Sequence, residues 1–139
     1  MSEAKKARIR VVSIMRDPDG DRSEIKNAHI GLCRCEGDAV TLEYDDVQDG
    51  ERAHIELSAA PGRAQMVRKG MTSAKMTFIP GERTSSAYVT MYGEIPVMTD
   101  TRQVLLSRTE GGGDLLLMYD VYVGGDMTAR TELRVTWRV

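Results

Sequence analysis

The chain has 139 residues, of which 29% are charged and 41% hydrophobic, and its formal net charge is -2. This composition is typical of a globular protein, since it is too apolar for a disordered chain and too polar for a membrane protein. The small negative charge argues against a general attraction to nucleic acid. The length predicts a single domain, residues 1–139, with one core.

Alternation between apolar and polar residues returns at short intervals along the whole chain, as in strands with one buried face. Gly, Asp and Pro residues, which favour turns, end each segment. In chain order the segments are 7–16, 24–36, 39–46, 53–60, 64–70, 74–81, 85–94, 95–109 and a closing hairpin from 115 to 139. The nearest candidate for a helix, residues 60–71, is interrupted by Pro61 and Gly62. The sequence therefore predicts an all-β antiparallel barrel or sandwich.

A basic cluster, "AKKARIR", opens the first segment. We interpret it as a solvated strand with Lys and Arg turned outward, in preference to a site for an anionic partner. The N-terminus lacks the apolar region of a secretory signal, and no segment approaches the length of a membrane span. We therefore expect a cytoplasmic protein that does not bind membranes.

The closing hairpin allows its register to be predicted. Pairing Val123 with Met127 around a three-residue connection, 124–126, matches every inward pair, including Tyr119 with Thr131 as well as Leu117 with Leu133 and Leu115 with Val135. The same register sets Asp120 opposite Arg130 on the outer face, a stabilising cross-strand pair. Trp137 is two residues from Val135 along the strand and so lies on the same face, and we expect its indole to point inward.

The two cysteines, Cys33 and Cys35, are two residues apart on one strand, which is too far for a comfortable disulfide, and we expect free thiols. A C-x-C pair can contribute to a metal site, but it needs two further ligands, and the only histidines are His29 and His54. His29 lies an even number of residues from both cysteines, so it shares their strand face and is the more suitable third ligand. We nevertheless predict no metal and no cofactor, and interpret this segment as a half-buried strand face.

Several motifs resemble functional sites without meeting their requirements. Asp17, Asp19 and Asp21 have the spacing of a calcium loop, but Arg22 and Ala28 stand where the loop needs Gly and Glu. "GERTSS" and "GGGDLLL" lack the ending of a phosphate-binding loop and a following helix. We interpret all three as turns. No nucleophile, acid and base form a recognisable catalytic set, so an enzyme is disfavoured.

The order of "VTLEYDD", "VRKGMTSAKMTFIPGERTSSAYVTMYGE", "TDTRQV", "GGDLLLMYDVYVGGD" and "TELRVTW" resembles the YwiB-like family of uncharacterised bacterial proteins, from about Val11 to the C-terminus. The family is similar to the calycins, the lipocalin-like superfamily of closed up-and-down barrels. The resemblance implies a barrel of about eight antiparallel strands. It implies no activity.

Inward polar side chains and methionines are the remaining candidates for function. Met66, Met76, Met91, Met98 and Met118 fall in strand-like runs, where methionine fills a core or lines an adaptable binding surface. Arg68 has the parity of Met66 and would point inward, where it would need an anionic or carbonyl partner. The alternative, which we favour, is that Gly70 marks a bulge that turns Arg68 to solvent.

Two functions remain open. The first, which we prefer, is a barrel that binds a small, partly apolar molecule in its mouth, with a wall formed by Arg68, Tyr88, Tyr92 and Tyr119. The second is a barrel filled by side chains that acts through its surface, as a homodimer or a partner-binding module. An open, partly polar interior would support the first, and an interior packed to native density the second.

Overall fold

The computed structural model describes residues 3–48 and 50–139 and contains ten antiparallel strands. The strands are β1 (Lys5–Arg16), β2 (Arg22–Glu36), β3 (Ala39–Gln48), β4 (Glu51–Ala60), β5 (Arg63–Lys69), β6 (Ala74–Phe78), β7 (Arg83–Thr90), β8 (Gly93–Thr109), β9 (Gly112–Val123) and β10 (Asp126–Arg138). The described residues form no helix, and therefore none that could cross a membrane. The predicted all-β class is confirmed, with ten strands in place of about eight.

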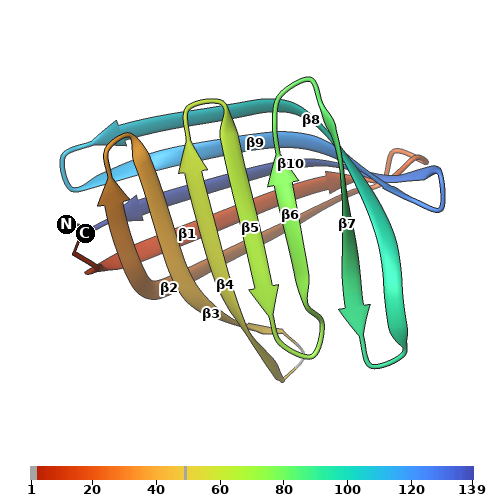
Figure 1. Cartoon of the computed structure of the whole chain (residues 1–139), viewed down its shortest axis with the longest axis horizontal. Helices are drawn as coiled ribbons and strands as arrows, with labels where there is room; N and C mark the ends of the chain where they lie inside the picture. Colours follow the sequence, from red (N-terminus) through yellow and green to blue (C-terminus); the bar gives the residue numbers. More distant parts are fainter. Residues whose placement is uncertain (1–2, 49) are drawn as a thin grey trace.

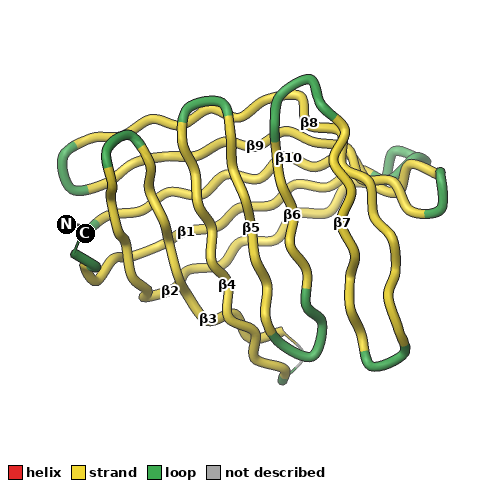
Figure 2. The backbone as a smooth tube through the Cα atoms, in the orientation of Figure 1, coloured by secondary structure: helices red, strands yellow, loops and turns green. Residues whose placement is uncertain are grey.

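Each strand pairs with its neighbours in sequence except β6 with β7, and the first strand pairs with the last, so the order in the sheet is β6-β5-β4-β3-β2-β1-β10-β9-β8-β7. The N- and C-termini consequently lie side by side (Figure 1). Strands β3 to β6 cross the long strands β9, β10 and β1 at a steep angle, and β8 bends between the two directions with β7 paired to its first half, which gives two layers with a common interior (Figures 1 and 2). The topology is that of an up-and-down barrel.

The barrel is nearly closed where β6 meets β7. Ser73 and Val89 exchange two backbone hydrogen bonds of 2.9 and 2.8 Å, and the Thr84 hydroxyl donates to the carbonyl oxygen of Thr77 at 2.6 Å. A continuous ladder joins all the other neighbouring strands. Closure matters physically, because it leaves few unpaired backbone groups at sheet edges.

Alternate residues of the strands form one apolar core between the two layers, as the alternation predicts. Its buried members are Ala7, Ile9, Cys33, Val40, Leu42, Tyr44, Ala53, Ile55, Leu57, Ala59, Ala64, Met76, Phe78, Val104, Leu115, Leu117, Tyr119, Leu133, Val135 and Trp137. Trp137 is 5% exposed, which confirms its inward orientation.

The closing hairpin has the predicted register over most of its length and a different tip. Asp120 faces Arg130, and the inward pairs from Val121 opposite Ala129 onward are as expected. The connection, however, has two residues, Gly124 and Gly125, with φ of +62° and +87°. Such dihedrals are those of a tight hairpin turn that matches the strand twist. The extra residue instead forms a bulge between Met127 and Ala129, so the expected pairing of Val123 with Met127 is wrong.

Candidate functional site

Arg68 lies on the inner face of the barrel, so the expected turn toward solvent is wrong. The pairing of β4 with β5 runs without a shift from His54 opposite Lys69 to Ala60 opposite Arg63, and it places Arg68 opposite the buried Ile55. Directly opposite residues of an antiparallel pair share a face. The Arg68 side chain is 23% exposed, and its Nη1 lies 3.7 Å from Oδ2 of Asp46, whose side chain is 16% exposed.

Two aromatic rings lie beside this ion pair. The His29 ring stacks on the buried Tyr44 with centroids 4.5 Å apart. Burial and the charge of Asp46 raise the pKa of Tyr44, the charge of Arg68 lowers it, and the pKa is about 12 as a result. His29, which shares a strand face with the two cysteines, thus packs against an aromatic ring and lies several residues from Cys33 along β2.

Tyr88 and Tyr119 also face the interior. The Tyr88 hydroxyl donates a hydrogen bond to Sδ of Met76 at 3.9 Å. The Tyr119 ring packs on Phe78 with centroids 4.7 Å apart. Burial raises the pKa of Tyr119 far above its ordinary value, nearby Tyr88 raises it further, and a hydrogen bond with Thr131 lowers it. These two tyrosines therefore share one region of the interior.

Two buried threonines complete that region, and neither was predicted from the sequence. Thr99 and Thr101 on β8 are 1% and 3% exposed, and neither hydroxyl has a hydrogen-bond partner among the described residues. Thr101 lies opposite Tyr119, and Thr99 opposite Thr84. Both lie an even number of residues from the buried Val97, and this spacing could have predicted their inward orientation. A buried hydroxyl without a partner is destabilising, so these atoms can bind water or a ligand.

Tyr92 lies apart from the other candidates. It is 92% exposed and forms, with Met91, the turn between β7 and β8. The expectation that these two residues belong to a strand is therefore wrong. The Thr90 hydroxyl accepts the Tyr92 N–H at 3.1 Å and donates to the Gly93 carbonyl oxygen at 3.0 Å. Gly93 has a φ of +125°, which favours glycine. This local chemistry overrides the alternating pattern of "SSAYVTMYGE".

The cysteines lie near the C-terminal end of β2. Cys33 is buried and Cys35 exposed, and both are free thiols, as expected. They contribute to a cavity of about 370 Å³ that Trp137, Arg108 and Gly112 also line. Burial and, to a lesser extent, the nearby Cys35 raise the pKa of the Cys33 thiol to about 11. The thiol form, which is a weak nucleophile, therefore predominates at neutral pH.

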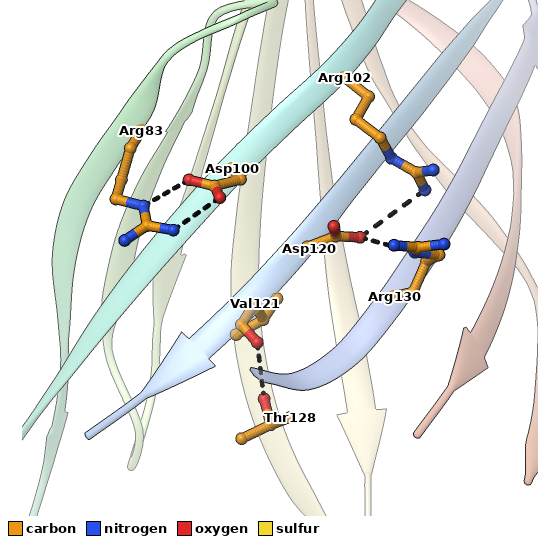
Figure 3. Close-up of polar contacts among 7 residues, drawn as sticks. All are labelled: Arg83, Asp100, Arg102, Asp120, Val121, Thr128 and Arg130. Atoms are coloured by element: carbon orange, nitrogen blue, oxygen red, sulfur yellow. Dashed lines mark hydrogen bonds and ion pairs between the residues drawn. The ribbon is translucent and has the colours of Figure 1, made fainter. Parts of the chain in front are cut away.

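The outer face of β7 to β10 carries a network of ion pairs (Figure 3). Arg83 holds Asp100 with two hydrogen bonds of 2.6 and 2.8 Å. Asp120 accepts a hydrogen bond of 3.1 Å from Arg130 and lies 3.7 Å from Arg102. Each carboxylate is thus paired with arginine on the same face, which is typical of a structural network.

Comparison with known proteins agrees with the fold. The chain is 22% identical over 129 residues to the "Uncharacterized beta-barrel protein YwiB" of Bacillus subtilis (strain 168), covering 93% of this chain and 90% of the relative. The crystal structure of the ywiB protein from Bacillus subtilis superposes with a TM-score of 0.87 at 21% identity, covering 97% of this chain and 92% of that one. The family model "Domain of unknown function (DUF1934)" matches residues 9–135, and the chain belongs to this family.

Proposed function

We propose that the protein is a binding barrel that holds a small, partly apolar molecule in its interior. The observation that carries the proposal is the pair of buried hydroxyls of Thr99 and Thr101, which have no hydrogen-bond partner among the described residues and lie on the inner face that Tyr88 and Tyr119 share. A chain that leaves two hydroxyls without partners gives up stability, which is typical of residues retained for a ligand. Polar groups of this kind fix the orientation of a ligand in an apolar pocket.

Other inward side chains of the barrel define the chemistry that we propose for the ligand. Met66 and Val121 are half-buried at the edge of the core and would contact its apolar part. Arg68 has five N–H donors, of which the ion pair with Asp46 engages only some. Hydroxyl and guanidinium donors together favour a head group that accepts hydrogen bonds, such as a carboxylate or a carbonyl.

Thr101→Val tests the proposal with a change of nearly constant shape. The variant removes an unpartnered hydroxyl, so we expect the ligand-free protein to gain stability, by about 1 kcal/mol. The same variant should lose affinity for decanoate, which combines a carboxylate with an apolar chain. Urea unfolding and competition between decanoate and a fluorescent apolar probe measure the two effects.

Thr131→Val is the matched control, because this buried threonine hydrogen-bonds Tyr119. It should destabilise the protein, since it leaves the tyrosine hydroxyl without that partner. Native mass spectrometry of freshly purified wild-type protein and Arg68→Met would then show whether a natural ligand is retained through the guanidinium. Unchanged stability and unchanged decanoate binding in Thr101→Val would refute the proposal.

A second candidate is a filled barrel that pairs with another copy of the chain. The continuous apolar core and the 54% exposed Leu105, which faces Leu116 on the outer side of β8 and β9, favour it. In that case Leu105→Glu should convert a dimer into a monomer in light scattering. A wild-type protein that is monomeric at all concentrations would exclude this candidate.

We also propose a cytoplasmic location. Its support is the pair of free cysteines, because a reducing compartment keeps neighbouring thiols unpaired. Fractionation of cells that express the protein at its natural level tests this proposal.

A further inference from the structure

The basic N-terminal segment lies beside the last strand, β10, a pairing that the sequence does not reveal. Arg8 on β1 lies directly opposite Arg138 on β10, at the other end of the chain, and Arg10 lies two residues further along, opposite Thr136. Side chains of such opposite pairs begin only about 4.5–5.5 Å apart, and two like charges there destabilise the sheet. Three guanidinium groups are thus gathered on the outer face by the pairing that closes the barrel.

These three arginines have no carboxylate partner among the described residues, in contrast to others on the same sheet. Arg83 and Arg130 are paired with Asp100 and Asp120 (Figure 3), and the neighbouring Arg134 lies 3.7 Å from Asp114. Arg8, Arg10 and Arg138 belong to no ion pair of this kind within residues 3–48 and 50–139, and all three are exposed. Their charges are therefore available to a ligand.

A groove of about 810 Å³ lies beside the three arginines. Gly112 and Gly113 line it and carry no side chains. A side chain at either glycine would collide with the backbone or ring of Trp137, which keeps both positions small. Hydroxyl-bearing side chains also line the groove: they belong to Ser107, Thr109 and Thr136.

We propose that this groove binds a small molecule that bears a phosphoryl group. Guanidinium groups match the oxygens of a phosphate with paired hydrogen bonds, and a dianion between Arg8 and Arg138 would cancel their repulsion. The lining hydroxyls donate to the same oxygens or to the rest of the ligand. Glu110 and Asp114, which also line the groove, would repel a phosphate chain that extended past the arginines. This arrangement favours a compact anion over a nucleic-acid strand.

The experiment uses pyrophosphate as the probe and the full-length protein. Calorimetric titration should detect binding that weakens with added salt, because the contacts are exposed charges. Arg8→Gln and Arg138→Gln should each lower the affinity by about tenfold or more, the loss expected for charge-assisted hydrogen bonds. Arg52→Gln, which removes an exposed arginine at the start of β4, a strand that does not line the groove, should leave the affinity unchanged.

Thermal unfolding provides an independent measurement. Without phosphate, Arg138→Gln should raise the melting temperature, because it removes the repulsion with Arg8. With pyrophosphate, the melting temperature of the wild type should rise, and that of Arg8→Gln should rise less at the same pyrophosphate concentration. Equal binding by wild type and the Arg8 and Arg138 variants would overturn the proposal, as would absence of binding. Tighter binding of a single-stranded oligonucleotide than of pyrophosphate would also overturn it, in favour of a nucleic-acid surface.

This site is independent of the barrel interior. Thr101→Val should leave pyrophosphate binding intact, and Arg138→Gln should leave decanoate binding intact. Either proposal can therefore fail alone.

Discussion

The contact between Gly113 and Trp137 leads to a quantitative prediction about stability. The two residues are opposite each other across β9 and β10, and the indole lies over the glycine. A methyl group added at Gly113 would lie 2.7 Å from Cη2 of Trp137 and 2.7 Å from the carbonyl oxygen of Ser107. Neither neighbour can withdraw freely, because the ring is packed in the core and the oxygen belongs to a paired strand.

Gly113→Ala should therefore destabilise the protein. Overpacking of this kind costs about 1–3 kcal/mol. Replacing glycine also restricts the unfolded chain, which offsets about 0.4–1 kcal/mol. We expect a net loss of about 1–2 kcal/mol, measured by urea unfolding followed by far-ultraviolet circular dichroism.

A double-mutant cycle with Trp137→Leu identifies the cause. If the ring is the main obstacle, Gly113→Ala should be less destabilising in the Trp137→Leu background, by about 1 kcal/mol. Gly111→Ala is the control: its φ is +82° but its surroundings are open, so its effect should not depend on Trp137. Additivity of the Gly113 and Trp137 changes within about 0.5 kcal/mol would refute the reasoning.

Three further predictions concern titration, ion pairing and thiol reactivity. A hydrogen bond with Asp45 raises the pKa of His54 in the folded state above its ordinary value of 6.5, so its stabilisation should be complete below that value and be lost as pH rises through the folded pKa. His54→Gln should remove this dependence from urea midpoints, and a wild-type midpoint constant over that range would contradict it. Asp120→Asn should cost about 1–2 kcal/mol in urea unfolding, because this buried carboxylate accepts a charged hydrogen bond, and an unchanged midpoint would contradict the role of the network. Cys35 should react with a thiol reagent well before Cys33, whose pKa burial raises to about 11, and equal rates would show that Cys33 is not protected.

The closing hairpin shows how far local patterns extend. Its alternation determined which residues point inward, the pairing of Asp120 with Arg130 and the burial of Trp137, because a one-residue slip would place charges in the core. The same pattern did not show that one residue of β10 is left without an opposite residue on β9, and the structure places this residue, Thr128, in a bulge. One extra residue shifts the register by the same amount whether it lies in the turn or in a bulge. Both arrangements therefore give the same inward pairs further along the hairpin.

The candidate site was only partly predictable from the sequence. Alternation along the strands predicted the inward orientation of Tyr119 and gave Arg68 the correct face as one of two alternatives. The turn at Tyr92 depends on hydrogen bonds of the Thr90 side chain, which the alternating pattern does not reveal. The unpartnered state of the Thr99 hydroxyl could not be predicted, because it depends on which strands lie across the interior.

The sequence by itself determined the strands, their faces and the all-β class, since a period of two residues is a local property of each segment. The tertiary structure alone decided which segments meet: β1 pairs with β10, so Arg8 meets Arg138, and Asp46 reaches Arg68 across an intervening strand. The physical reason is that an alternating segment can pair equally well with many others. Closure of the barrel around one core selects among these pairings, and it is a property of the whole chain.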